Sequence, residues 1–315
     1  MSEIRSEATA PSNIALIKYM GKTSHESNRP TNPSLSYTLD HLITKVRLVA
    51  ADKDGWAPLT EPGFEAIQLS EKGQLRYLNF LSKLKSHFGI TECFRVESAN
   101  NFPSDCGIAS SASSFAALTK AVAALAKQGD HSPEALSKLS RQGSGSSCRS
   151  LFTPWAVWKD EAAEPVDLGI DRLIHVLVLG DDSVKLVSSS EAHKRVAQSP
   201  LFDGRVDRAI DRFDRLMVAL REDQWKEAYQ ICWQEFWDMH ALFETSPEPF
   251  GYMNANSLLI LREAEAQWRS NGTGPIVTMD AGANVHLMYK ESQSGLVDEI
   301  VRRYQELGLR TVRSH

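Results

Sequence analysis

The sequence predicts an α+β fold built from two closely joined domains. Stretches of alternating apolar residues and stretches with apolar residues at helical spacing follow one another without a regular βαβ alternation. The chain has 315 residues, which is more than a single hydrophobic core usually organises. We expect one domain over residues 1–182 and a second over residues 183–315.

The first half of the chain is predicted to combine short strands with three helices. Residues 33–39 alternate and lead through a break into the β-rich run 44–50, which indicates paired strands. Ser132 precedes Pro133 and is therefore the expected N-cap of a helix. The expected strands are residues 8–15, 33–39, 44–50 and 94–98, and the expected helices are residues 73–88, 109–127 and 133–141.

The second half is predicted to be richer in long helices. It opens with LIHVLVLG (173–180), a continuous apolar run typical of a buried strand. Two further strands are expected at residues 276–280 and 285–289, on either side of a turn. The expected helices are residues 203–221, 224–243, 257–271 and 294–306.

Composition and charge narrow the class of protein. The net charge is −5 and the sequence has no basic stripe, so nucleic acid is not an expected partner. No apolar run approaches the roughly 20 residues that span a bilayer, and the polar start does not resemble a signal peptide, so we expect a cytoplasmic protein without a membrane partner. The 4 cysteines are far apart and lack the paired spacing of zinc ligands or of a disulfide framework, so no protein metal site is expected.

One candidate anion site is the segment NFPSDCGIASSA (101–112), which leads into an Ala-rich helix. A helix N-terminus offers unpaired N–H groups and the positive end of the helix dipole. The small residue Gly107 would let a phosphate approach the backbone, and Ser110 and Ser111 could donate hydrogen bonds. An ordinary serine-capped helix explains this segment about equally well.

A second candidate anion site is GSGSSCRS (143–150). Five small residues in sequence are poor core material, and Arg149 could grip an anion with two parallel hydrogen bonds. A flexible surface loop is the alternative. The presence of two such Ser/Gly segments in one chain strengthens the anion-site interpretation of each.

Two charged residues outside these segments could take part in chemistry. Asp280 ends a predicted strand in TMDAGANV (278–285), where it could be a general base on a rigid strand end or a simple turn residue. Lys18 follows apolar residues, so its stem is expected to be partly buried, and a buried lysine needs a partner. Lys22 is explained as well by solvation as by function.

Taken together and in this order, the segments resemble diphosphomevalonate decarboxylases, a family of the GHMP kinase superfamily. That family typically shows APxNIAxxKYWGK, PxNSSLSxTL, NNFPTAAGLASSA, GSGSACRS and TxDAGPN. Here the segments read APSNIALIKYMGK, PTNPSLSYTL, NNFPSDCGIASSA, GSGSSCRS and TMDAGAN. The resemblance runs from Ala10 to about Asn284. It implies a GHMP kinase fold, with a ribosomal protein S5 domain 2-like N-terminal domain and a ferredoxin-like α/β C-terminal domain.

The resemblance implies an enzyme that uses ATP to decarboxylate mevalonate 5-diphosphate. In such an enzyme ATP phosphorylates the C3 hydroxyl, phosphate leaves and carbon dioxide follows, which gives isopentenyl diphosphate, ADP and phosphate. Phosphoryl transfer depends mainly on positioning and charge neutralisation. ATP and Mg²⁺ are the expected cofactors, with magnesium bridging the ATP phosphates, and a homodimer is the expected assembly.

The resemblance also implies roles for individual residues. Asp280 is expected to orient or deprotonate the C3 hydroxyl, and Lys18 beside it would keep its carboxylate ionised. Arg149 is expected to hold the substrate carboxylate, with Asn13 orienting it. The other expected contacts are Tyr19, Lys22, Ser144 and Ser146 with the substrate and Gly107, Ala109, Ser110 and Ser111 with the ATP phosphates.

The chain departs from the family pattern at several positions. Met20 replaces a tryptophan, Asp105 places a negative charge near the phosphate loop, and Glu191 stands in a segment that usually reads GM…VETS. Two related activities therefore stay open: decarboxylation of mevalonate 5-phosphate, and phosphorylation of C3 alone. A catalytically silent binding homologue is the alternative from another class. The presence of Asp280 and Arg149 favours full decarboxylation.

Overall fold

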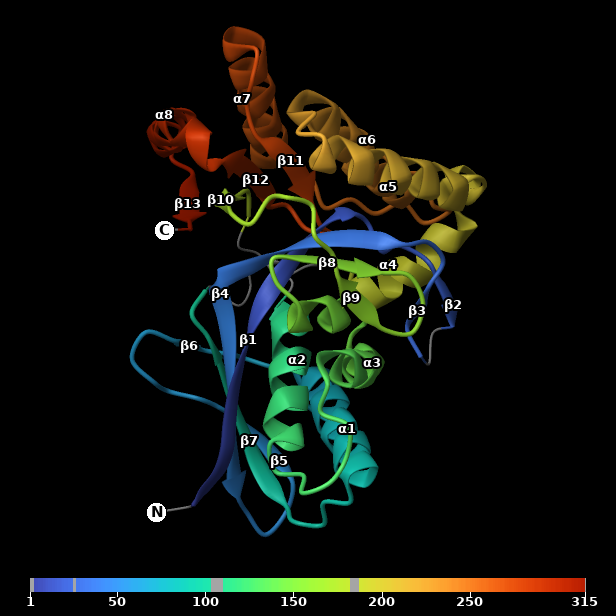
Figure 1. The fold of residues 1–315 in the computed structure, drawn as a ribbon, viewed down its shortest axis with the longest axis vertical. Coiled ribbons are helices and arrows are strands. Elements are labelled where there is room, and N and C mark those ends of the chain that lie inside the picture. The colour runs from blue at the N-terminus through green and yellow to red at the C-terminus, as the bar shows by residue number, and fades with distance from the viewer. Residues whose placement is uncertain (1–2, 25–26, 103–109, 182–186, 315) are drawn as a thin grey trace.

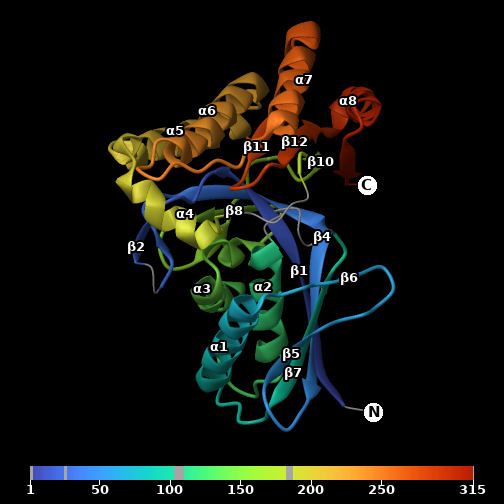
Figure 2. The same ribbon diagram turned by 180° about the vertical axis from the view of Figure 1, so that it is seen from behind.

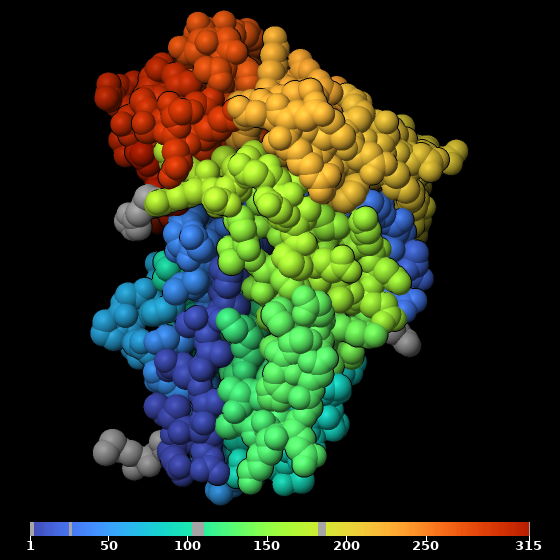
Figure 3. All heavy atoms as spheres, viewed as in Figure 1, coloured from blue at the N-terminus to red at the C-terminus, as the bar shows by residue number. Residues whose placement is uncertain are grey.

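The computed structural model describes residues 3–24, 27–102, 110–181 and 187–314. They form two units, each a β-sheet with helices packed on it, stacked end to end (Figure 1). Figure 3 shows the same division on the surface, with the C-terminal residues gathered at one end and the N-terminal residues at the other. Strands and helices are mixed without a regular βαβ order, so the predicted α+β class is confirmed.

The N-terminal unit is a seven-stranded sheet covered on one face by three helices (Figures 1 and 2). Its path is β5-β7-β4-β8-β9, with β1 beside β4, β6 beside β7, and a separate β2–β3 pair. Val46 and Val96 of the sheet pack against Leu81 and Leu118 of the helices. The strands are β1 (Ile4–Ile17), β2 (Lys22–Ser24), β3 (Arg29–Pro30), β4 (Ser34–Ala50), β5 (Gly55–Pro58), β6 (Glu65–Ala66), β7 (Phe94–Asn100), β8 (Trp155–Trp158) and β9 (Ala163–Pro165). The helices are α1 (Glu71–Phe88), α2 (Ser110–Ala123) and α3 (Pro133–Gly143), followed by the short 3-10 helix η1 (Gly145–Leu151).

The prediction of two strands within residues 33–50 is wrong. They form the single long strand β4, and both of its halves pair with β1. The register jumps from Pro11 opposite Ile43 to Ser12 opposite Leu39, so residues 40–42 bulge out of the ladder. The polar residues that suggested a break occupy this bulge, which bends the strand without ending it.

The C-terminal unit is a four-stranded antiparallel sheet in the order β11-β12-β10-β13. Its strands are β10 (Leu173–Leu179), β11 (Ile276–Met279), β12 (Val285–Lys290) and β13 (Arg310–Arg313). Its helices are α4 (Ser189–Arg195), α5 (Arg205–Arg221), α6 (Trp225–Glu244), α7 (Ala255–Asn271) and α8 (Ser294–Glu306), with short 3-10 turns η2 (Val196–Gln198), η3 (Pro200–Phe202) and η4 (Glu291–Gln293). Because β10 pairs with β12 and β13, a division after residue 182 would separate β10 from its partners.

The predicted helix ends agree best with the structure where the sequence contains a clear capping residue. The Ser132 side chain accepts a hydrogen bond from the N–H of Ala135, which confirms the predicted N-cap of α3. The helix predicted over residues 109–127 ends earlier, at Ala123, because residues 124–126 tighten into a turn. The pattern missed this end because good helix formers continue past it, and helix boundaries are poorly marked by propensity. The short strands β5, β6, β8, β9 and β13 were not predicted, since two to four residues carry too little periodicity.

The two units share a hydrophobic core at their junction. Ile14, Leu16 and Ile17 of β1 lie in one buried cluster with Leu177 and Leu179 of β10, together with apolar residues of α5 and α6. The end of β1 is therefore held between the units. Within the described part of the chain, no helix is long and apolar enough to cross a membrane.

Candidate active site

The ends of β1 and β11 bring Lys18 and Asp280 together at the junction of the two units. Each is the first residue after its strand. The Lys18 ammonium lies 2.8 Å from Asp280 Oδ1 and also donates to the carbonyl of Ala15 at 2.7 Å. The lysine side chain is 2% exposed and that of Asp280 is 30% exposed. Lys18 is thus a buried lysine with a carboxylate partner, and Asp280 is more than a turn residue.

The ion pair sets the protonation of Asp280. Burial acts to raise the pKa of this carboxyl, but the charge of Lys18, aided by His286 and Arg149, lowers the pKa below its ordinary value. Burial lowers the pKa of Lys18, and Asp280 opposes that change. An ionised carboxylate at the edge of a pocket is suited to accept a hydrogen bond or a proton from a hydroxyl.

Arg149 in η1 is a buried guanidinium fixed by polar partners. Its Nε donates to Asn13 Oδ1 at 3.1 Å and its Nη1 donates to the Ser34 hydroxyl at 2.9 Å. Asn13 in turn donates to the Ser150 hydroxyl at 2.8 Å and to the Ser146 carbonyl at 3.1 Å. These bonds hold the plane of the guanidinium at the pocket wall, where a planar fork suits a carboxylate.

The small residues around η1 are required by close packing. A Cβ added at Gly145 would lie 2.6 Å from the Tyr19 ring, and one added at Gly143 would lie 2.2 Å from the Phe115 ring. The segment 143–150 is largely buried, so its interpretation as a flexible surface loop is wrong. Because the turn is tight, Ser144 and Ser146 both line the pocket.

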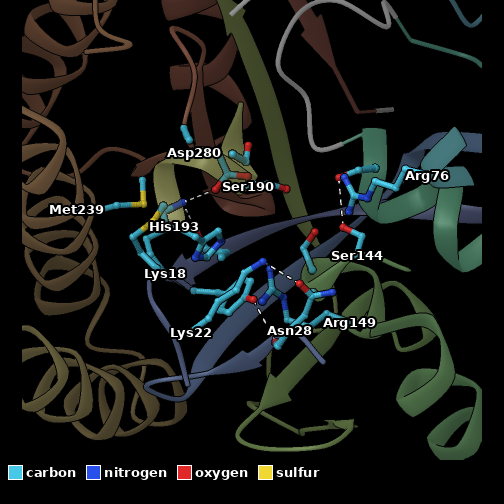
Figure 4. Close-up of a pocket in the computed structure, with 18 residues that line it drawn as sticks. Lys18, Lys22, Asn28, Arg76, Ser144, Arg149, Ser190, His193, Met239 and Asp280 are labelled. Carbon is cyan, nitrogen blue, oxygen red and sulfur yellow. Dashed lines mark hydrogen bonds and ion pairs between the residues drawn. The ribbon is translucent and has the colours of Figure 1, made fainter. Parts of the chain in front are cut away.

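Cations gather at the other end of the pocket (Figure 4). Lys22 donates to Asn28 Oδ1 at 2.7 Å, and the Tyr19 hydroxyl donates to the carbonyl of Asn28 at 3.1 Å. Arg76 projects from α1, and an adjoining pocket that shares Lys22, Asn28 and Arg76 is also lined by Lys194. Burial, followed by the charges of Arg76 and Lys194, lowers the pKa of Lys22 to about 8. The cluster makes this end suited to an anion, which favours the functional interpretation of Lys22 over simple solvation.

The predicted phosphate loop is only partly within the described residues. Ser111, in the first turn of α2, lines the pocket, and the Ser144 hydroxyl lies 3.4 Å from its hydroxyl. Ser110 begins α2. The predicted contacts Gly107 and Ala109, and the altered position Asp105, lie outside the described residues.

One open pocket at the junction of the two units collects most of the predicted site residues. Those that line it are Lys18, Tyr19, Lys22, Ser111, Ser144, Ser146, Arg149 and Asp280. Asn13 supports Arg149 from behind instead. Of the described lining residues, Asp280 is the one acid, and it lies at the Lys18 end (Figure 4).

Several further lining residues escaped the sequence analysis, among them Asn28, Arg76, Ser190, His193 and Met239. Arg76 lies on an amphipathic helix, where an arginine that points to a pocket cannot be told from a solvated one. His193 comes from α4; its Nδ1 accepts the N–H of Gly21 at 3.1 Å, and its ring lies 4.4 Å from the Tyr19 ring. The one sequence feature that could have pointed to His193 is its place in the segment around Glu191, which departs from the family pattern.

Two family models together match nearly the whole chain. Residues 10–167 match the diphosphomevalonate decarboxylase-like N-terminal domain, and residues 174–311 match the mevalonate 5-diphosphate decarboxylase C-terminal domain. A diphosphomevalonate decarboxylase of Aspergillus fumigatus is 32% identical over 93% of this chain and 78% of its own. One of Gibberella zeae is 31% identical over 93% of this chain and 83% of its own.

Solved structures share the fold over the same extent. A mevalonate diphosphate decarboxylase from Legionella pneumophila is 43% identical and superposes with a TM-score of 0.91, covering 98% of this chain and 99% of its own. A structure of MDDEF in complex with MVAPP, AMPPCP and magnesium is 29% identical, with a TM-score of 0.86 over 97% of this chain and 95% of its own. The GHMP kinase-type, two-domain α+β fold implied by the motifs is thereby confirmed.

Proposed function

The chain belongs to the diphosphomevalonate decarboxylase family, and on that premise we propose that it decarboxylates mevalonate 5-diphosphate at the expense of ATP. The products are isopentenyl diphosphate, ADP, phosphate and carbon dioxide, and the reaction passes through phosphorylation of the C3 hydroxyl. The observation that carries this proposal is the pocket itself. It places an ionised carboxylate, a buried arginine and a cationic end along the wall of one open cavity.

Asp280 is the group proposed to receive the C3 hydroxyl. Its carboxylate stays ionised beside Lys18, whose ammonium is 2.8 Å away, and can therefore orient the hydroxyl or accept its proton during phosphoryl transfer. In this proposal the positive charge of Lys18 also stabilises negative charge that develops on the group transferred beside Asp280.

Arg149 is proposed to bind the substrate carboxylate. Two of its nitrogens are already fixed by Asn13 and Ser34, so the guanidinium loses little freedom when the substrate binds. Arg149 would hold the carboxylate in one orientation. The carbon–carbon bond to the carboxylate is then aligned with the C3–oxygen bond through which phosphate leaves. Positioning of this kind is a large part of catalysis in a reaction that forms a cationic centre.

The cationic end is proposed to bind the 5-diphosphate. Lys22 and Arg76 supply charge, while Tyr19, Ser144 and Ser146 supply or position polar groups along the pocket. This separation puts the charged tail of the substrate at one end and its reacting carbon at the other, near Asp280.

ATP and Mg²⁺ are the proposed cofactors. Ser110 and Ser111 at the start of α2, together with Gly107 and Ala109 before it, would surround the ATP phosphates. The Ser111 hydroxyl faces the same pocket as Asp280, which fits a γ-phosphate brought toward the substrate hydroxyl. Magnesium bound with ATP neutralises charge on the phosphates.

Three properties of the whole protein are proposed on the family alone. These are a homodimeric assembly, a cytoplasmic location and a division into two domains, the second of which carries Asp280. We assign β10 to that second domain, because it pairs with β12 and β13. Light scattering of the purified protein measures the assembly, with twice the 35.1 kDa chain mass as the expected result.

The substrate is tested by offering ATP and Mg²⁺ with mevalonate, its 5-phosphate or its 5-diphosphate, and measuring ADP and carbon dioxide together. We expect one carbon dioxide per ADP, with the highest kcat/KM for the 5-diphosphate. Preference for the 5-phosphate would reassign the substrate. ADP formed without carbon dioxide would contradict decarboxylation, and no turnover on any of the three would indicate a silent homologue.

A further inference from the structure

A buried carboxylate outside the pocket holds the main chain of Lys18. Glu235 lies in α6 and is 0% exposed. Its Oε1 accepts the backbone N–H of Lys18 at 3.0 Å, while the carbonyl of Lys18 accepts from Asn32 Nδ2 at 3.0 Å. The last residue of β1 in the strand ladder is Ile17, so Lys18 has left the sheet. Its backbone is held by these two side chains in place of strand pairing.

Two arginines of α5 fix the Glu235 carboxylate in turn. Arg205, itself 0% exposed, donates to both carboxylate oxygens, and Arg212 donates to Oε2 at 3.0 Å. A carboxylate with these three partners has little freedom to rotate. Helices α5 and α6 of the C-terminal unit thus hold Lys18, the first residue after β1 of the N-terminal unit.

We propose that Glu235 is a positioning residue for the reaction: through the backbone of Lys18 it sets where the Lys18 ammonium lies relative to Asp280. The inference rests on the proposed function. A misplacement of about 1 Å in a catalytic group can cost roughly a hundredfold in rate, so the position of the Lys18 ammonium has a measurable effect on kcat. The side chain of Glu235 does not line the pocket in the described structure, so it acts through Lys18 rather than on the substrate.

Glu235 also acts on Lys18 electrostatically. The groups that face Lys18 from its surroundings are Asp280 after β11, Glu235 and Cys232 from α6, Arg149 from η1, and His286 from β12. Burial lowers the pKa of Lys18, and Asp280 and Glu235 both oppose that change. Removing the charge of Glu235 lowers the pKa of Lys18 further, so activity that needs the ammonium is lost at a lower pH.

Asp238 offers a matched control on the same helix. It lies three residues after Glu235 and contacts the same arginines, with Arg212 Nη1 at 2.6 Å and Arg205 Nη1 at 3.6 Å. The contacts of Asp238 in the described structure do not include Lys18. Glu235→Gln and Asp238→Asn therefore both perturb one arginine cluster, in which Asp238 also contacts Arg208, while only Glu235→Gln alters the support of Lys18.

The experiment compares kcat, KM and the pH profile of the full-length variants with mevalonate 5-diphosphate and ATP. For Glu235→Gln we expect kcat to fall about tenfold to a hundredfold, KM to stay within about threefold, and the alkaline limb of kcat/KM to move to lower pH. For Asp238→Asn we expect both constants within about twofold of wild type and an unmoved alkaline limb. Equal kcat values and equal pH profiles for the two variants would overturn the inference.

A double variant separates positioning from stability. Arg205→Met with Glu235→Leu removes both buried charges, and replacing a buried ion pair by apolar groups is often neutral or stabilising. We expect the Tm of the double variant to be closer to that of wild type than the Tm of Glu235→Gln, while its kcat stays as low as that of Glu235→Gln. Recovery of kcat together with Tm would show that Glu235 is only structural and would overturn the inference. A wild-type chain that releases no carbon dioxide would instead overturn the proposed function and this inference with it.

Discussion

The two ends of the pocket are built on different principles. At the Lys18 end the charges are paired and are held by both units of the protein: the buried Lys18 ammonium lies 2.8 Å from the partly exposed Asp280, and Glu235 accepts the backbone N–H of Lys18. At the Lys22 end, cations lie near one another and Lys22 bonds to a neutral amide, that of Asn28, at 2.7 Å. Burial there, followed by repulsion from Arg76 and Lys194, lowers the pKa of Lys22 to about 8.

This contrast indicates which end of the pocket performs the chemistry and which end binds the substrate. Paired charges are preorganised and need no ligand to be stable, which suits a site that must stabilise a transition state. Lys22 and Arg76 bond to neutral groups in the described structure, so an anion that binds there relieves their repulsion, which suits a site that provides affinity. Variants at the two ends should therefore change different kinetic constants.

The largest effect is expected for Asp280→Asn. The amide keeps the shape of the side chain but can neither accept the hydroxyl proton nor pair with Lys18, so kcat should fall by about 10³-fold, within the range for loss of a general base. ATP affinity, measured by calorimetry, should stay close to that of wild type. Near-native turnover would remove Asp280 from its proposed function.

The next effect concerns Lys18→Met and its pH dependence. In the wild-type protein the lysine lowers the pKa of Asp280, so the carboxylate stays ionised as the pH falls. Without that charge the pKa of Asp280 rises, and the acid limb of kcat/KM moves to higher pH. A pH profile of residual activity checks this shift, and an acid limb that stays in place or moves to lower pH would contradict the electrostatic pairing.

A smaller effect, on a different constant, is expected for Lys22→Met. Loss of one charged hydrogen bond to phosphate costs about 1.5–3 kcal/mol, or roughly a tenfold to hundredfold rise in KM. Because the pKa of Lys22 is about 8, KM of the wild-type enzyme should also rise as the pH passes that value, while KM of the variant should respond less. Steady-state kinetics between neutral and alkaline pH measure both, and a fall in kcat with unchanged KM would contradict a binding role.

The smallest effect is expected for Ser132→Ala, which lies away from both ends of the pocket. Loss of the N-cap bond to Ala135 should lower the free energy of unfolding by about 1 kcal/mol. Denaturant unfolding measures this change, and kcat and KM should equal those of wild type. A changed KM would show that the binding end is sensitive to general loosening of the N-terminal unit.

The features that could be predicted from the sequence are those set by residues close together in the chain. The N-cap at Ser132, the apolar run of β10 and the ordered motifs around Lys18, Arg149 and Asp280 depend on residues close together in the chain. Long-range placement was not predictable in the same way. Arg76 reaches the pocket from a helix, and nothing in its neighbours distinguishes it from a solvated arginine.

The same limit explains the errors and omissions. The break expected within β4 is a bulge, and only the pairing of both halves with β1 reveals it. Glu235 lies 217 residues from Lys18 in the chain, so no spacing rule could connect them. Contacts of this kind arise from tertiary packing, which overrides local patterns where two units meet.

The most direct test of the difference between the two ends is a comparison of kcat and KM for Asp280→Asn and Lys22→Met with mevalonate 5-diphosphate. We predict that Asp280→Asn lowers kcat and leaves KM within about threefold, whereas Lys22→Met raises KM at least about tenfold and leaves kcat within about threefold. If both variants lowered kcat equally with KM unchanged, the pocket would not be divided into a reacting end and a binding end.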